Sequence, residues 1–310
     1  MGLNVIFFGT PGPAAESLKA LIASEHSVLS VVTAPDRPRG RGMELHPSEV
    51  KVLAMGSGLE VLQPSSLKNE EIQQALRDRG ADAFVVTAYG IILPKAVLEI
   101  PRLGCLNTHF SLLPKFRGAA PIQWALLERH TLTGVTVMRM DEGLDTGPIL
   151  AQIEEPILPG DTAGTLGQRL SSKGSEILVK VLDLLMAGPL DGHQQHGDEA
   201  TLARKLSPAD ARLDWTSDAE ALEAKVRAMD PKPGSWTTFR QKRLKVWRAQ
   251  ISADVSAGPP GSIGVSQEWL TVATATQSLL LEEVHPEGSS RMSAAEFIRG
   301  YRPQTGEVLS

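Results

Sequence analysis

The chain has 310 residues, of which 42% are hydrophobic and 22% are charged. This is the composition of an ordinary globular protein, and the length predicts one or two domains. The formal net charge of -5 excludes a protein that is cationic overall, so any contact with nucleic acid has to use local basic patches.

The N-terminal apolar run at 4–9 is too short for a signal peptide and has no basic residue before it. No stretch approaches the roughly eighteen apolar residues that a membrane helix needs. The single Cys105 excludes an internal disulfide, and its apolar neighbours LGCL predict a buried structural thiol. We therefore expect a cytoplasmic protein without membrane contact.

Apolar runs alternate with helical patterns through the first half of the chain. This alternation is typical of an α/β protein with a doubly wound, mostly parallel sheet, in which sites lie beyond the carboxyl ends of the strands. An amphipathic helix at 162–188 is expected to complete this domain, which would span residues 1–189. The expected strands lie at 4–9, 27–33, 82–88, 104–110 and 134–140.

The chain changes character after residue 189. Residues 190–206 are polar, contain Gly and Pro and lack periodicity, which predicts a linker. From 207 to 310, short strand patterns with Gly-Pro turns follow a helical pattern at 218–229. This arrangement predicts a second domain built as a small, OB-like β-barrel.

The stretch NTHFSLLPKFRG, which begins at Asn107, contains the first candidate site. Asn107 and His109 are two residues apart near the end of an expected strand, so both should point to one face while Phe110 faces the core. An amide can donate a hydrogen bond to an oxygen that gains charge, and a histidine can do the same when protonated or can transfer a proton. Spacing alone also allows a pair that caps the backbone of a loop.

Asp145 is the candidate partner of this histidine. It lies in MDEGLDTG, where two glycines predict a loop that could bring the carboxylate beside His109. A carboxylate there would orient the imidazole and favour its charged form. The alternatives are a turn or cap residue, or a metal site of His109, Asp141 and Asp145. We expect no metal, because this group contains a single histidine and no pair at ligand spacing.

Two basic segments could contact phosphates. The segment PDRPRGRG at 35–42 has arginines among prolines and glycines and no core residue, which predicts an exposed loop. Its candidate contacts are Arg37, Arg39 and Arg41.

The second basic segment, at 232–248, has six Lys or Arg residues and no acid, interleaved with Trp236, Phe239 and Trp247. Basic and aromatic residues on a small β-barrel favour nucleic-acid binding. A solvated face above core tryptophans would produce the same pattern. The candidate contacts are Lys242, Arg243 and Lys245.

Taken together, these residues resemble the folate-dependent formyltransferases. That family shares an Asn-x-His-x-Ser-Leu-Leu-Pro segment, found here from Asn107, and a later Asp in a Leu-Asp-Thr-Gly-like loop, found here at Asp145. PDRPRGRG, VTAYGIILPKAVL, LDW at 213–215 and KVWRA at 245–249 further resemble the members that act on tRNA. The resemblance covers nearly the whole chain.

The resemblance implies that Asn107, His109 and Asp145 are catalytic. It implies 10-formyltetrahydrofolate as the formyl donor, the amino group of methionyl initiator tRNA as the acceptor, and no metal. The segment around Arg41 would reach the acceptor end of the tRNA, the barrel at 207–310 would bind tRNA, and a monomer would be sufficient. The implied folate site is lined by Ser111, Leu112, Leu113 and Pro114.

Other activities of the same family remain open. Enzymes that formylate an amino sugar nucleotide or a small amine, or that hydrolyse formyltetrahydrofolate, would share the residues around His109 and Asp145. They would not need the two basic segments, which favour a tRNA substrate. An RNA-binding protein with a decayed transferase domain is disfavoured, because all three catalytic positions are filled. The chain departs from the family pattern at Gly12-Pro13, Met43-Glu44 and Phe110, which replaces a usually small residue.

Overall fold

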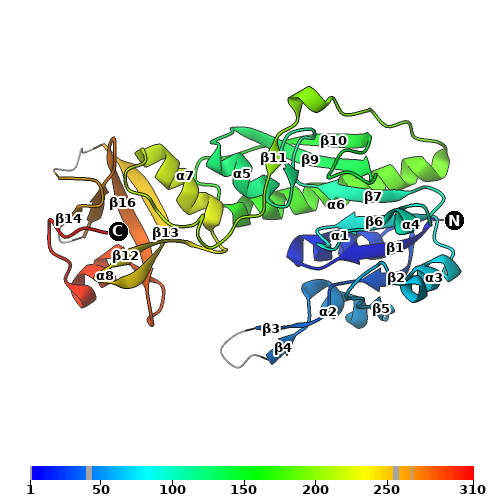
Figure 1. Cartoon of the computed structure of the whole chain (residues 1–310), viewed down its shortest axis with the longest axis horizontal. Helices are drawn as coiled ribbons and strands as arrows, with labels where there is room; N and C mark the ends of the chain where they lie inside the picture. Colours follow the sequence, from blue (N-terminus) through cyan, green and yellow to red (C-terminus); the bar gives the residue numbers. More distant parts are fainter. Residues whose placement is uncertain (1, 40–43, 254–257, 267) are drawn as a thin grey trace. The chain divides into compact units, whose positions relative to one another are not determined.

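The computed structural model describes residues 2–39, 44–253, 258–266 and 268–310 (Figure 1). The chain forms two compact units. The first comprises Met1–Ala119, Leu132–Pro156 and Gly167–Ala203, and the second comprises Ala120–Thr131, Ile157–Leu166 and Arg204–Ser310. Within the described ranges, no helix is both long and apolar enough to cross a membrane.

The first unit is built on a seven-stranded sheet with the order β10-β9-β7-β6-β1-β2-β5. Five neighbouring strands of this sheet, β7, β6, β1, β2 and β5, are parallel to one another. At the other edge, β9 is antiparallel to β7 and β10 is antiparallel to β9. The doubly wound, mostly parallel sheet is thus confirmed, with an antiparallel hairpin at one edge. The strands are β1 (Asn4–Gly9), β2 (Ser27–Val32), β5 (Val61–Leu62), β6 (Ala83–Thr87), β7 (Cys105–His109), β9 (Leu132–Arg139) and β10 (Ile149–Pro156).

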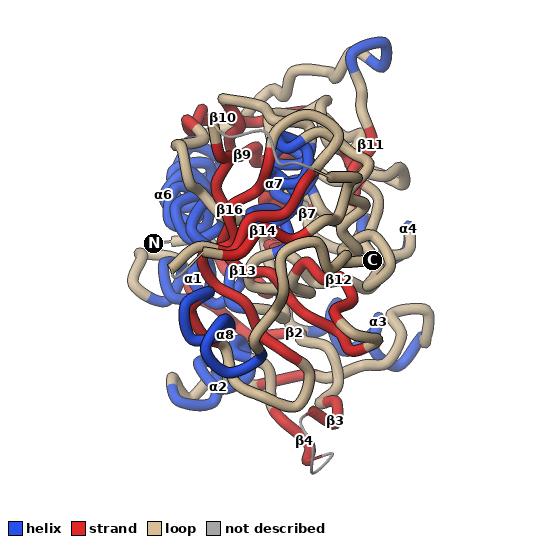
Figure 2. The backbone as a smooth tube through the Cα atoms, turned by 90° about the vertical axis from the view of Figure 1, so that its left-hand side faces the viewer, coloured by secondary structure: helices blue, strands red, loops and turns tan. Residues whose placement is uncertain are grey.

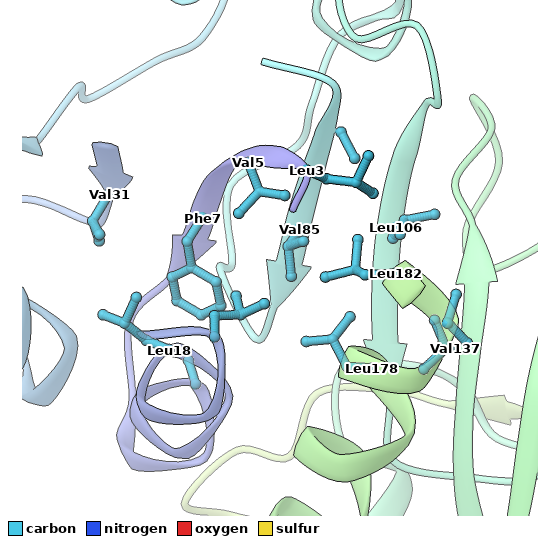
Figure 3. Close-up of a cluster of buried hydrophobic side chains, with 14 of the residues drawn as sticks. Leu3, Val5, Phe7, Leu18, Val31, Val85, Leu106, Val137, Leu178 and Leu182 are labelled. Carbon is cyan, nitrogen blue, oxygen red and sulfur yellow. The ribbon is translucent and has the colours of Figure 1, made fainter. Parts of the chain in front are cut away.

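Helices cover both faces of this sheet, which is why its central strands are apolar throughout. On one face, α1 (Gly12–Ile22), α2 (Glu49–Gly56) and α6 (Ala163–Ala187) enclose a buried core. Figure 3 shows Leu178 and Leu182 of α6 and Leu18 of α1 directed at the sheet. On the other face lie α3 (Glu70–Asp78) and α4 (Lys95–Leu98). Gly12-Pro13 opens α1, where proline fits the first turn.

The second unit contains antiparallel strands in the order β12-β13-β16-β15-β14, with β17 paired to β16. The C-terminal residues complete a barrel: the backbone of Ser310 exchanges hydrogen bonds with Thr238 of β12, while Leu309 and Glu307 bond to Gly261 and Ile263. Both sheet edges are thereby paired, which confirms the β-barrel. The elements are α5 (Pro121–Leu127), α7 (Ala219–Met229), β12 (Ser235–Phe239), β13 (Lys242–Ser252), β14 (Ile263–Val265), β15 (Leu270–Ala273), β16 (Ser278–Pro286), β17 (Met292–Ser293) and α8 (Ala294–Tyr301).

The arginine segment is a two-stranded hairpin rather than the loop that its composition predicts. Strand β3 (Arg37–Arg39) pairs with β4 (Glu44–His46), and Figures 1 and 2 show the hairpin extending away from α2. An Arg-Pro dipeptide holds its first residue extended, which suits a strand as well as a loop. The connecting residues 40–43, including Arg41 and Met43, lie outside the described residues.

Glu155 makes a buried ion pair that stabilises the antiparallel edge of the sheet. Its carboxylate is 8% exposed and accepts from Lys173 Nζ and Arg169 Nε of α6, both at 2.8 Å. The hydrogen bond from Lys173, assisted by Arg169, holds the pKa of Glu155 below its usual value, although burial acts in the opposite direction. A depressed carboxyl pKa stabilises the fold above the unfolded-state value, and this stabilisation is lost as the pH falls through the folded-state value.

We therefore expect Glu155→Gln to lower the free energy of unfolding at pH 7 by about 1–3 kcal/mol, since two cations lose their anion. Urea denaturation from pH 7 to pH 3.5 should show a constant difference from wild type at neutral pH that shrinks below about pH 4.5. The exposed neighbour Glu154 provides the control, and Glu154→Gln should match wild type. A difference for Glu155→Gln that is equally large at both ends of the range would contradict this assignment.

Candidate active site

Asn107 and His109 project from the same face of β7, and His109 is its last residue. Phe110 follows on the opposite side, where it is buried against Gly174 of α6. A Cβ at Gly174 would lie 3.4 Å from the Phe110 ring and 3.0 Å from Thr108, so the helix passes close to the strand there. The large side chain at position 110 thus packs into the core rather than beside the imidazole.

The loop 141–147 follows β9, which runs antiparallel to β7, and it therefore folds back along β7. The backbone N–H of Met140 donates to Cys105 O at 2.8 Å, so the loop starts near the amino end of β7. Asp141 shapes it from within: its Oδ1 accepts from Gly143 N at 3.0 Å and from Thr146 Oγ1 at 2.7 Å. In the described part of the chain, no group of three or more His, Cys, Asp or Glu residues is arranged to hold a metal ion.

The folded-back loop brings Asp145 to both polar residues of β7. Asn107 Nδ2 donates to Asp145 Oδ1 at 3.4 Å, and His109 Nδ1 lies 3.6 Å from Asp145 Oδ2. The imidazole is 6% exposed and the carboxylate 13% exposed. These separations are long for strong hydrogen bonds, but catalytic hydrogen bonds often shorten only when substrate is bound. The amide of Asn107 and the ring of His109 thus converge on the largely buried carboxylate of Asp145.

The backbone carbonyl of Phe116 sets the orientation of the His109 ring. It lies 2.9 Å from His109 Nε2. A carbonyl oxygen can only accept, so Nε2 carries a proton. Nδ1 is therefore the ring nitrogen that faces Asp145, and it becomes a donor there when the ring is protonated.

Asp145 is itself held by backbone groups. Its Oδ2 accepts from Gly118 N at 2.8 Å. Its own φ is 53°, a left-handed conformation that costs a residue with a Cβ about 1–2 kcal/mol. Such strain persists only where surrounding contacts enforce it.

Residues 195–203 supply several of these contacts, although their polar, aperiodic sequence indicates only a linker. Thr201 Oγ1 accepts from Phe116 N at 2.8 Å, and β11 (Leu202–Ala203) pairs with β8 (Arg117–Gly118). The 3₁₀ helix η1 (Gly197–Glu199) lies between. The segment thus holds Phe116, whose carbonyl orients His109, and Gly118, whose amide orients Asp145, through backbone pairing and hydrogen bonds. Gln195 and Thr201 carry no motif that sequence inspection could detect.

The segment 111–114 is held in place by hydrogen bonds to Lys115 and to Thr136 of β9. Ser111 and Leu113 are buried, at 0% and 3% exposed, and the Ser111 hydroxyl donates to Lys115 O at 2.6 Å. Thr136 Oγ1 donates to Ser111 O and accepts from Leu113 N. Leu112 and Pro114 are half-buried, so these two are the side chains of the segment that can meet a ligand.

Cys105, on the same strand, takes no part in this chemistry. It is 1% exposed, and burial raises the pKa of its thiol to about 12. A thiol in this state is not a nucleophile at neutral pH, which confirms the structural role expected from its apolar neighbours.

The second basic segment forms a face of the barrel on which cations stack against tryptophans. Trp236 and Trp247 are half-buried, whereas Phe239 belongs to the core. The Arg243 guanidinium lies 4.4 Å from the Trp236 ring centre, and Lys245 Nζ lies 5.2 Å from that of Trp247. This arrangement has the exposed positive charge and aromatic surface that single-stranded nucleic-acid sites use.

Within the part of the chain that the structure describes, four of its six cations have no acidic partner, and three of these four are the candidate contacts. Arg240 is bound to Glu307, and Arg248 lies 3.8 Å from Glu282. Across the described residues, Lys242, Arg243 and Lys245 form no ion pair, although Lys245 Nζ donates to Pro233 O. Arg212 and Arg291, which composition alone did not single out, also lie over Trp236 and Trp247.

The first basic segment is described in part. Arg37 is exposed on β3, and for Arg39 the backbone alone is described.

Family models match both units of the chain. One described as formyl transferase matches residues 3–182, and one described as formyl transferase, C-terminal domain, matches residues 205–302.

Two similar proteins match over nearly their whole length. The chain is 46% identical over 306 residues to a methionyl-tRNA formyltransferase from Aromatoleum aromaticum, and the match spans 98% of this chain and 96% of that protein. It is 47% identical over 309 residues to a methionyl-tRNA formyltransferase from Thiobacillus denitrificans, with 99% of each covered.

Among solved structures, HypX from Aquifex aeolicus in complex with tetrahydrofolic acid has a TM-score of 0.66 and 15% identity. The match covers 100% of this chain and 51% of that one. At this identity the likeness shows a common fold.

Proposed function

The chain belongs to the formyl transferase family, and we propose that it transfers a formyl group from 10-formyltetrahydrofolate to the amino group of methionyl initiator tRNA. The single observation that supports this reaction most directly is the convergence of Asn107 and His109 on Asp145 within 3.6 Å. The activity of the two relatives that match over nearly their whole length supports the acceptor.

In the proposed mechanism, the neutral aminoacyl nitrogen attacks the formyl carbon, so that the carbonyl oxygen gains negative charge. The Asn107 amide and the Nδ1–H of protonated His109 donate hydrogen bonds to that oxygen. The 3.6 Å separation of Nδ1 from Asp145 Oδ2 is too long for a strong hydrogen bond, so this proton can turn to the substrate. Asp145 keeps the imidazole charged and oriented, and assists the proton as it leaves the amine through water. The carbon–nitrogen bond to the folate then breaks, and the folate nitrogen takes a proton. No metal is required, because side chains supply the stabilising charge.

The folate would lie against the segment that follows His109. The half-buried Leu112 and Pro114 offer apolar surface for a flat ring, while the buried Ser111 and Leu113 hold the segment in shape. We assign folate binding to these four residues together, with the first two as direct contacts.

The tRNA would use both basic segments. We propose that residues 1–189 form the catalytic domain, 190–206 the linker and 207–310 the tRNA-binding domain, with Lys242, Arg243 and Lys245 as phosphate contacts. The acceptor end of the tRNA would contact Arg37, Arg39 and Arg41. One copy of the chain supplies all these groups, so we propose an active monomer, working in the cytoplasm where translation begins.

The test of this function is formyl transfer from radiolabelled 10-formyltetrahydrofolate. We expect labelling of charged initiator tRNA, and none of uncharged tRNA or free methionine. Labelling of an amino sugar nucleotide in preference to the charged tRNA would instead support the alternative activity of this family.

The barrel face makes a separate prediction about salt. If Lys242, Arg243 and Lys245 contact phosphates, replacing all three by Gln should lower the affinity of the protein for every tRNA to a similar degree. The slope of log affinity against log salt should flatten by about 0.7–0.9 for each phosphate that the protein no longer neutralises. Filter binding at a series of potassium chloride concentrations measures both quantities.

Lys19, Lys68 and Lys180 provide a matched control, because all three are exposed on the first unit. Replacing them by Gln changes the net charge equally and should leave the slope at its wild-type value. A wild-type slope and affinity in the barrel variant would show that this face is not the tRNA platform.

A further inference from the structure

The Gln195 side chain connects the 141–147 loop to the segment after His109. Its Nε2 donates to Asp145 O at 2.8 Å and to Gly147 O at 2.7 Å. Its Oε1 accepts from Arg117 Nε at 3.1 Å and from Arg117 Nη2 at 2.7 Å. Four hydrogen bonds of 3.1 Å or less thus converge on one amide, and Nε2 also lies 3.9 Å from Met138 Sδ.

These four bonds use the full capacity of the group. A side-chain amide has two N–H donors and an oxygen with two lone pairs, and here each is occupied. The chemistry also determines which way the amide faces, since the carbonyls of Asp145 and Gly147 can only accept and the guanidinium can only donate. Gln195 is half-buried, so solvent does not easily replace these bonds.

One of the two bonded carbonyls belongs to the residue whose backbone is strained. Asp145 has φ 53°, and Gly147 lies where a Cβ would be 1.8 Å from Arg139 O. The 141–147 loop therefore passes close to Arg139 in an unfavourable backbone conformation. The Gln195 amide stabilises this conformation through its hydrogen bonds to Asp145 O and Gly147 O. The carboxylate of Asp145 projects from this same peptide to His109.

We propose that Gln195, supported by Arg117, is a positioning residue that holds the Asp145 carboxylate at its working distance from His109 and Asn107. The proposal rests on the function assigned above, and it acts through Asp145 rather than through contact with substrate. A displacement of about 1 Å in a catalytic group can cost a hundredfold in rate. Loss of the amide should therefore act on turnover more than on binding.

Two variants test this inference. Gln195→Ala removes all four bonds, and Gln195→Glu keeps the length of the side chain and its partner Arg117 but replaces both donors. We expect kcat to fall about ten- to a hundredfold in both, with KM for tRNA and folate within about threefold of wild type. Because Gln195→Glu is nearly isosteric, it remains informative if Gln195→Ala folds poorly.

A double-mutant cycle separates positioning from general damage to the fold. If Gln195 acts through Asp145, adding Gln195→Ala to Asp145→Ala should lower kcat by no more than about twofold further. The adjacent Gln194 is exposed and of the same chemistry, so Gln194→Ala serves as the control with wild-type turnover. Wild-type kcat in Gln195→Glu, or losses that multiply in the double variant, would overturn the inference.

The ring nitrogen signals of His109 in NMR spectra provide a readout that does not need activity. They should move in Gln195→Glu and stay unchanged in Gln194→Ala, and an unchanged signal in both would count against the inference. If the wild-type chain formylated no tRNA while these signals still moved, the proposed function would be wrong and the positioning role would stand.

Discussion

His109→Ala is expected to lower kcat for formyl transfer by about a hundred- to a thousandfold, the equivalent of about 2.7–4 kcal/mol for one lost oxyanion donor. The ring makes one side-chain bond to backbone, at Phe116 O, and one close approach to Asp145. Folding should therefore survive its removal, and the loss should fall on turnover. Single-turnover assays with saturating donor and charged tRNA measure the effect without a contribution from product release.

The exposed His193 offers a matched control, and His193→Ala should retain wild-type turnover. Circular dichroism would establish that the His109→Ala protein is folded. A folded His109→Ala enzyme with wild-type turnover would remove the imidazole from the mechanism.

Asp145→Asn is expected to lower kcat by about ten- to a hundredfold, the range for losing a hydrogen bond to a charged group. The variant keeps the shape of the side chain but not its charge, so the protonated imidazole of His109 loses its counter-ion 3.6 Å away.

Single-turnover measurement of kcat for wild type and Asp145→Asn tests this expectation. Asp191 is exposed on the same unit, and Asp191→Asn should retain the wild-type kcat. A folded Asp145→Asn enzyme with wild-type kcat would mean that the carboxylate does not act on His109.

Local pattern was sufficient for much of this protein. Strand period placed Asn107 and His109 on one face and Phe110 on the other, because alternation is a property of any extended chain. Apolar runs marked the central strands, since each is buried on both faces. The long amphipathic pattern at 162–188 corresponds to α6 at Ala163–Ala187.

Strand direction and closure were decided by tertiary structure. Nothing in the sequence of β9 marks it as antiparallel, because an apolar strand fits either pairing. The barrel closes through residues 307–310, whose hydrogen bonds come from backbone and so leave no side-chain signature. The hairpin of β3 and β4 likewise depends on pairing between two short segments rather than on either alone.

The sequence by itself offered Asn107, His109 and Asp145 as candidates from residue type and spacing, and its resemblance to the formyltransferases implied that they are catalytic. The tertiary structure decided how they are held. His109 is oriented by the carbonyl of Phe116 and Asp145 by the amide of Gly118. Because nearly every residue has both backbone groups, the sequence does not show which of them make these contacts. Gln195 reaches the loop from fifty residues away in a segment without periodicity. Such contacts depend on long-range backbone placement, which local pattern does not encode.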